Sequence, residues 1–110
     1  MAMWPKFSPD FKQLAFFGSK APFHSHTTCY QLFQISWPLV NSSEPPVADM
    51  ILDQVQTIEE NNEYGGLYGY QFTFAHAGYL NERFFLMISE FKGADRIYIC
   101  DMIDKKVKML

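Results

Sequence analysis

The stretch RFFLMISEFKGADRIYICDMI, residues 83–103, decides the fold class of this chain. It holds two runs rich in β-branched and aromatic residues, at 83–91 and 96–103, with a short polar segment at 92–95 between them. Such residues are typical of strands, and two strands joined by a short connection pair as an antiparallel hairpin. We therefore expect two neighbouring antiparallel strands here.

Two further runs extend the expected sheet. Residues 67–76 have a similar composition and are separated from the first run by the turn-forming residues 78–82. Residues 28–37 alternate between apolar and polar side chains until Pro38, which cannot continue a strand ladder. The sequence thus predicts four strands, of which the last three form a meander.

The segments before these strands carry helix signals. Ser8 places a hydroxyl N-cap before a proline at the first helical position, which predicts a short helix from about Pro9 to Phe17. A second helix is predicted from about Pro45 or Pro46 to Asn61, where apolar residues recur at helical spacing. This apolar stripe consists of Val47, Met50, Ile51, Val55 and Ile58. The element order predicts a single α+β domain, residues 1–110, with helices packed on one face of a mainly antiparallel four-stranded sheet.

The composition indicates a folded domain. The 110 residues are 48% apolar and 17% aromatic, which is too apolar for a disordered chain and enough for a core without disulfides. We expect Cys29 and Cys100 to be buried free thiols, because they lie in strand-like runs and form no dense disulfide pattern. No run of about 18 apolar residues and no leader-like N-terminus occurs, so a cytoplasmic protein without a membrane segment is expected.

The charges are segregated along the chain. No lysine or arginine occurs between Lys20 and Arg83, whereas that interval holds seven acidic residues, and the net charge is −3. Opposite the apolar stripe of the second predicted helix, an acidic ridge is formed by Asp49, Asp53, Gln56, Glu60 and Glu63. The C-terminal end of this predicted helix, where the helix dipole disfavours anions, is crowded by Glu59, Glu60 and Glu63.

An uncompensated anionic ridge is typical of a surface that binds cations of a partner. We therefore predict a small acidic protein-binding module without cofactor or catalytic residues. It would be an inhibitor or immunity-type protein that masks the cationic site of a basic partner such as a toxin or nuclease. The predicted partner-binding residues are Asp49, Asp53, Glu59, Glu60, Glu63, Tyr64 and Tyr68.

Two qualifications belong to this prediction. An anionic surface repels phosphates, so no nucleic-acid partner is expected. The alternative to a binding surface is that Arg83, Arg96 or Lys92 neutralises the acids within the fold.

Two other functions stay open. His24, His26 and His76 fit a small enzyme or a metal-binding domain if the fold brings them together, although no established ligand spacing links them. Exposed aromatic residues fit a homo-oligomeric ligand-binding regulatory domain, and the candidates are Trp4, Phe16, Phe17 and Tyr79. The sequence has no GxSxG, Walker, dinucleotide-binding or HExxH motif.

Overall fold

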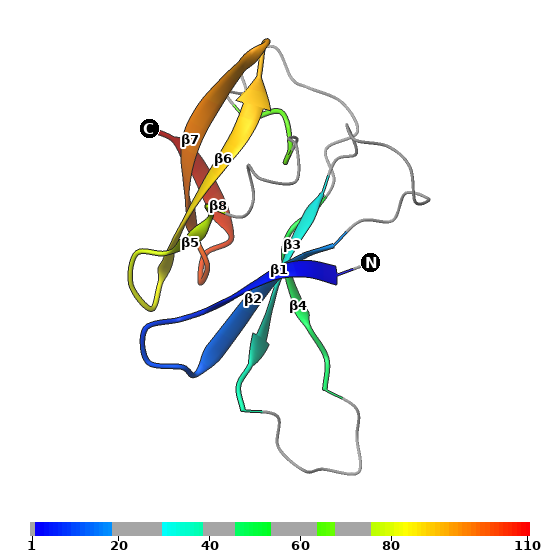
Figure 1. Ribbon diagram of the computed structural model, residues 1–110, viewed down its shortest axis with the longest axis vertical. Helices are drawn as coiled ribbons and strands as arrows, with labels where there is room; N and C mark the ends of the chain where they lie inside the picture. Colours follow the sequence, from blue (N-terminus) through cyan, green and yellow to red (C-terminus); the bar gives the residue numbers. More distant parts are fainter. Residues whose placement is uncertain (1, 19–29, 39–45, 54–63, 68–75) are drawn as a thin grey trace.

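The chain is built from strands in two antiparallel sheets. A computed structural model describes residues 2–18, 30–38, 46–53, 64–67 and 76–110. The first sheet consists of β1 (Ala2–Phe7), β2 (Gln13–Gly18), β3 (Gln31–Ser36) and β4 (Asp49–Leu52). The second consists of β5 (Gly78–Tyr79), β6 (Phe84–Phe91), β7 (Ala94–Asp101) and β8 (Lys106–Met109). In both sheets the spatial order of the strands is their order in the sequence, as Figure 1 shows.

The predicted α+β class is therefore wrong, because the described residues contain strands and turns and no helix. The first predicted helix, Pro9 to Phe17, is a tight turn followed by β2. Ser8 Oγ donates to Asp10 Oδ1 at 2.7 Å and accepts from the Gln13 backbone N–H at 3.0 Å. The hydroxyl that predicted a helix cap thus closes a turn, a role that serine side chains perform equally well. Pairing with β1 and β3 on its two sides then holds Gln13–Gly18 extended.

The second predicted helix is also wrong in its described part, since Asp49–Leu52 forms β4 against β3. An irregularity in this pairing leaves Ile51 unopposed, and both Ile51 and Leu52 are buried. Two consecutive buried residues break the strand period of two and imitate a helical stripe. Val47, assigned to the same stripe, is exposed. Residues 54–61 of the predicted helix lie outside the described residues.

The hairpin predicted from residues 83–103 is confirmed as β6 and β7. Phe91 pairs with Ala94 across the two-residue turn Lys92-Gly93, in which both residues have positive φ, 53° and 78°. This conformation matches the twist of the flanking strands and allows the shortest connection. Because the turn takes two residues, β7 begins earlier than predicted.

The other predicted strands have mixed outcomes. The run at 28–37 contains β3, as expected. Of the run at 67–76, the structure describes Leu67, which forms an isolated bridge with Tyr30, and His76, which lies in a turn. The sequence prediction missed β8, whose lysines alternate with Val107 and Met109 packed against the core.

The core lies between the two sheets. Phe17 of β2 meets Phe85 of β6 with ring centroids 6.1 Å apart, and Tyr79 packs edge-on against Phe85 at 5.1 Å. A bulge between Met3 and Lys6 turns Trp4 onto the rings of Phe17 and Tyr30. Cys100 is a buried free thiol as predicted, whereas Cys29 lies outside the described residues. The buried apolar residues are Ala15, Phe17, Leu32, Ile51, Leu52, Tyr64, Leu67, Ala77, Phe85, Met87, Phe91, Tyr98, Cys100 and Met102.

The two sheets contact each other at more than one place. The first strands, β1 and β5, lie in contact. At the other edge, Lys105 in the turn before β8 donates to Asp49 Oδ1 of β4 at 2.7 Å. The sheets are therefore in contact at their first strands, and an ion pair joins the turn before β8 to β4.

We predict that Phe85→Ala destabilises the chain by about 3–5 kcal/mol, because it opens a cavity where the two sheets meet. Leu80→Ala, at a residue 54% exposed in the β5–β6 turn, serves as the control and should change stability little. Denaturant unfolding measures both variants. Similar losses in the two variants would contradict the location of the core.

We predict that Gly93→Ala lowers stability by about 1 kcal/mol, because a side chain at positive φ is strained. An added Cβ at Gly93 meets nothing within 4 Å, so only backbone strain is tested. Gly78→Ala is the matched control: its Cβ also meets nothing, and no positive φ opposes it. Thermal unfolding should show a loss for Gly93→Ala and none for the control.

Candidate functional site

The acidic residues of the described chain are engaged in contacts within the fold. Asp49 forms the ion pair with Lys105 described above, so a lysine neutralises it, although not one of the cations predicted for this role. The Asp53 carboxylate accepts from Gln31 Nε2 at 2.7 Å. Asp49 is in register with Gln34 on β3. Because Gln31 and Gln34 are three residues apart on one strand, they point to opposite faces of the first sheet.

Asp49 and Asp53 consequently do not form one continuous ridge. Side chains four apart share a helix face, but the irregular pairing of β4 separates these two. Glu59, Glu60, Glu63 and Tyr68 lie outside the described residues. Their assignment as partner-binding residues stays a prediction from the sequence.

Tyr64, predicted as an exposed anchor, is instead buried. Its ring meets the ring of Tyr98 edge-on, with centroids 5.3 Å apart. Burial of both rings places Tyr64 in the core between the sheets, where it stabilises packing. A tyrosine beside glycines has an aromatic ring that suits either an interface or a core, and the sequence does not distinguish the two.

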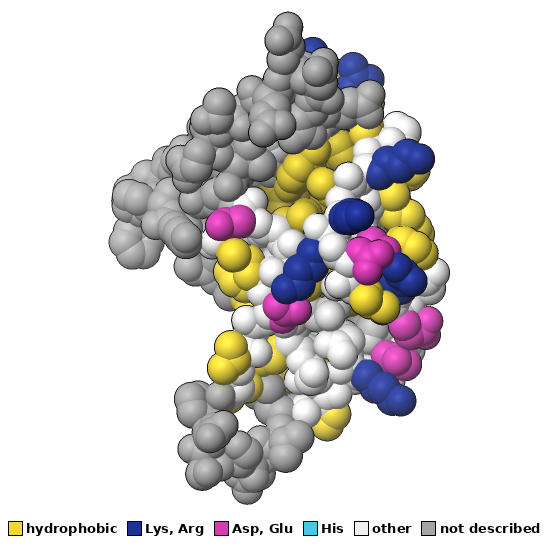
Figure 2. Space-filling model, turned by 180° about the vertical axis from the view of Figure 1, so that it is seen from behind, with side chains coloured by type: hydrophobic (Ala, Val, Ile, Leu, Met, Phe, Trp, Pro, Cys, Tyr) yellow, Lys and Arg dark blue, Asp and Glu magenta, His cyan; other side chains and the backbone are white. Residues whose placement is uncertain are grey.

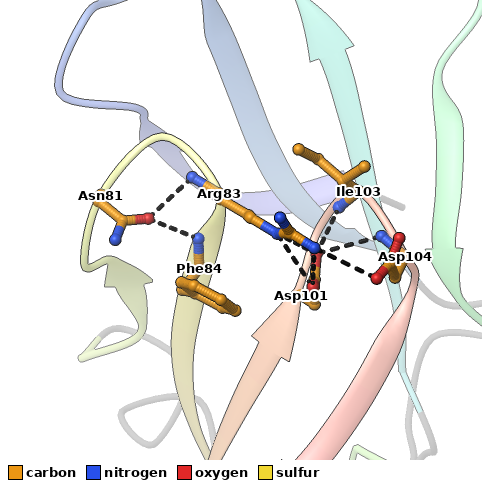
Figure 3. A network of polar contacts seen from close by, with 6 residues as sticks. All are labelled: Asn81, Arg83, Phe84, Asp101, Ile103 and Asp104. Carbon is orange, nitrogen blue, oxygen red and sulfur yellow. Dashed lines mark hydrogen bonds and ion pairs between the residues drawn. The ribbon is translucent and has the colours of Figure 1, made fainter.

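The densest described polar cluster centres on Arg83 and Asp101, as Figure 3 shows. Arg83 Nε and one terminal guanidinium nitrogen donate to Asp101 Oδ2 at 3.0 and 2.7 Å, and the same terminal nitrogen reaches Asp104 Oδ2 at 3.2 Å. Asp101 Oδ1 also accepts from the backbone N–H groups of Ile103 and Asp104. Asn81 Oδ1 accepts from the backbone N–H groups of Arg83 and Phe84.

This cluster joins the β5–β6 turn to the β7–β8 turn. The guanidinium hydrogen bond is the main reason why the pKa of Asp101 falls to about 2, and the same contact raises the pKa of Arg83. Sequence reasoning missed the cluster. An Asp whose carboxylate can accept from the backbone N–H groups two and three positions later is typical of a turn, but the arginine partner of Asp101 lies 18 residues earlier in the chain.

Three potential nucleophiles among the described residues, Cys100, Tyr79 and Ser89, are held in unreactive states. Burial, assisted by the nearby Asp101 charge, raises the pKa of the Cys100 thiol to about 12, so the reactive thiolate is absent at neutral pH. Burial also raises the pKa of Tyr79, whose hydroxyl donates to Gln34 Oε1 at 2.8 Å. The Ser89 hydroxyl is fully buried and donates to the Gly66 carbonyl at 2.7 Å.

The predicted histidine site is only partly described. His76 is exposed in a turn, while His24 and His26 lie outside the described residues. Within the described ranges no group of three His, Cys, Asp or Glu residues could hold a metal ion. The metal-binding alternative stays a prediction. The described part of the chain also has no helix long and apolar enough to cross a membrane.

We predict that Asp101→Asn reduces the acid sensitivity of folding. The folded pKa of about 2 lies below the ordinary value of 3.8, so this carboxylate stabilises the fold above pH 4 and loses that contribution as the pH falls towards 2. The variant should be less stable than the wild type at pH 7, and the difference should shrink in acid. Denaturant unfolding at several pH values measures this.

Asp104→Asn is the control for that measurement, since Asp104 makes a single, longer contact at an exposed position. The Asp104→Asn variant should lose nearly as much stability between pH 7 and pH 2 as the wild type does. If the Asp101→Asn variant lost as much stability in acid as the wild type, the Arg83–Asp101 pair would not be the source of the acid sensitivity.

The chain matches, over residues 1–110, the family model for the N-terminal domain of the acylamino-acid-releasing enzyme. The chain belongs to this family. No curated protein and no solved structure shows a significant match. The family membership overturns the interpretation as an inhibitor or immunity-type protein, which rested on charge segregation alone.

Proposed function

We propose that this member of the N-terminal domain family is a non-catalytic β-sheet part of an acylamino-acid-releasing enzyme, against which the catalytic part packs. The observation that carries this proposal is the combination of a match along all 110 residues with two complete, mutually packed meanders. The name of the family's enzyme describes a reaction that releases acylated amino acids. In this proposal the chain supports that reaction and does not perform it.

The architecture supports a place in a larger β-sheet assembly. Each sheet has four antiparallel strands in sequence order, with first strand against first strand and the ion pair at the fourth. Neighbouring blades of a β-propeller have the same arrangement. We interpret the two sheets as two neighbouring blades.

The chemistry of the described side chains supports a scaffold role. The Cys100 thiol is protonated, the Ser89 hydroxyl is buried against a backbone carbonyl, and Asp101 is held by Arg83. Each of these groups stabilises a turn or the core. None of them has the activated, accessible state that a nucleophile needs.

We predict that the purified chain does not release acylated amino acids from N-acylated peptides. Mixed with the separately produced catalytic part of an acylamino-acid-releasing enzyme, it should bind that part and raise its thermal stability or its activity. Binding is measured by co-elution, and release of acylated amino acids by chromatography.

An unrelated all-β domain of similar size is the control in the mixing experiment, because it tests for non-specific protection. Release by the chain alone, in a preparation free of other proteases, would refute the non-catalytic role. Absence of both co-elution and any effect on the catalytic part would refute the supporting role.

A further inference from the structure

Three aromatic rings form a row on the surface at one end of the first sheet. Phe7, at the end of β1, lies between Phe11 and Trp37, with ring centroids 5.8 Å and 5.4 Å away. The rings are inclined to the Phe7 ring by 51° and 67°. Phe7 is 43% and Phe11 66% exposed, while Trp37 is half-buried. We call Phe7, Phe11 and Trp37 the aromatic row.

Hydrogen bonds hold the turn that presents Phe11. The buried Ser8 hydroxyl accepts from the Gln13 backbone N–H, and the Phe11 backbone N–H donates to the Ser8 carbonyl at 2.9 Å. The Trp37 backbone N–H donates to the Lys12 carbonyl at 2.8 Å, which ties the end of β3 to the same turn. The backbone under the aromatic row is therefore fixed before any partner binds.

Phe11 has a backbone conformation that is strained for its side chain. Its φ is 58°, in the left-handed region that glycine adopts easily and a bulky residue does not. Burial does not compensate this strain, because the residue is mostly exposed. A glycine would form the same turn without strain, so the turn alone does not account for a phenylalanine here. Strained backbone of this kind is typical of sites that hold a ligand.

A carboxylate lies next to the aromatic row. Asp10 precedes Phe11, and its described hydrogen bonds, from the Ser8 hydroxyl and the Lys12 backbone N–H, both go to Oδ1. The Ser8 bond is the main reason why the pKa of Asp10 is lowered, so the group is ionised at neutral pH. Among the described ion pairs none joins Asp10 to Lys12. The Oδ2 atom of Asp10 can therefore accept from a cation of a partner.

The β5–β6 turn lies beside this turn and extends the exposed surface. Burial and then the Asp10 charge raise the pKa of Tyr79 in β5, and β1 contacts β5, so the two turns are neighbours, as Figure 1 shows. Leu80, which is 54% exposed, and the exposed Glu82 belong to the β5–β6 turn. In Figure 2 the two turns lie toward the lower right, where hydrophobic side chains are exposed beside acidic and basic ones.

The aromatic row is too small to be the interface of a folded partner. An aromatic side chain buries about 150–250 Å² when fully covered, so the exposed parts of Phe7 and Phe11 offer roughly 200 Å². A stable interface between folded proteins buries about 800 Å² on each partner. Leu80 and the half-buried Trp37 do not close this gap. An extended segment of a few residues fits this area better than a folded surface does.

We propose that the aromatic row binds an extended, proline-containing segment of a partner protein, with a basic residue of that segment at Asp10. A polyproline II helix is extended before it binds, so it loses little entropy when it docks on aromatic rings. It advances by about 3.1 Å per residue, so each step between neighbouring rings of the row corresponds to about two residues. Rings inclined to each other suit a helix whose residues point in three directions.

Charge complementarity favours a basic residue in the segment. A guanidinium group can donate to Asp10 Oδ2 while its planar face stacks on the ring of Phe11. Glu82 of the neighbouring turn adds a second negative charge. An acidic segment would meet these two carboxylates and is disfavoured.

The first experiment titrates the full chain with a short proline-rich peptide that carries one terminal arginine, and calorimetry measures the dissociation constant. Two control peptides have glutamate in place of the arginine, or glycine and serine in place of the prolines. The proposal expects each control peptide to bind about fivefold more weakly or not at all. Equal binding by the peptide without prolines would indicate a purely electrostatic contact and overturn the proposal, as would absence of binding by all three peptides.

Phe11→Gly separates binding from folding. Glycine adopts this φ without strain, which offsets the greater freedom of the unfolded chain, so the variant should unfold at about the temperature of the wild type. It should bind the arginine peptide about tenfold more weakly or not at all. Ile103→Ala, at a residue 67% exposed in the β7–β8 turn, is the control and should bind as the wild type does. Wild-type affinity in Phe11→Gly would overturn the proposal.

Asp10→Asn tests the place of the basic residue. Asparagine keeps an Oδ1 acceptor for Ser8 and Lys12 but removes the charge, so the variant should bind the arginine peptide about fivefold more weakly and the glutamate peptide no more weakly than before. Equal weakening for both peptides would overturn the placement at Asp10. These outcomes are independent of the proposed function, which is tested by co-elution with the catalytic part and not by peptide binding.

Discussion

The contact between Phe17 and Phe85 is the interaction on which the rest of the structure depends. It joins two sheets that come from opposite halves of the sequence, and each sheet buries core residues against the other. A single four-stranded sheet of this size needs a hydrophobic partner to be stable. The inward aromatic and sulfur-containing side chains of both sheets gather around this contact, including Trp4, Met87 and Cys100.

Polar contacts around this core favour one relative position of the two sheets. Tyr79 reaches Gln34 near the centre of the interface, and Lys105 reaches Asp49 at the fourth strands. Of the acidic residues of the middle segment, Asp49 meets Lys105 of the C-terminal segment. Exposed pairs of this kind contribute little stability, but they favour one relative position of the sheets over others.

Membership of the N-terminal domain family gives the exposed apolar residues of both sheets a context. In the proposed role, the chain packs against a catalytic part, and apolar residues on alternate positions of β2, β3, β6 and β7 are candidates for such a contact. The charge pattern, which predicted a cationic partner, did not indicate the family to which the chain belongs.

The local strand signals were sufficient for part of the fold. The hairpin of β6 and β7 follows from β-branched and aromatic runs around a glycine turn, because these preferences act over a few residues. The helices predicted at Pro9–Phe17 and Pro45–Asn61 failed because a serine turn and an irregular strand pairing have the same local spacing as a helix cap and a helical stripe. The predicted continuous ridge of Asp49 and Asp53 is wrong for the same reason, because these two residues share a face only if the segment is helical.

By itself, the sequence determined that the chain has a core, that residues 83–103 form a hairpin, and that Cys100 is buried. These properties depend on composition and on short-range preferences. Only the tertiary structure decided that Gln13–Gly18 and Asp49–Leu52 are strands, that Tyr64 lies in the core, and that Arg83 meets Asp101. Each of these depends on pairing between distant segments, and the free energy of that pairing outweighs the local preference of any one of them.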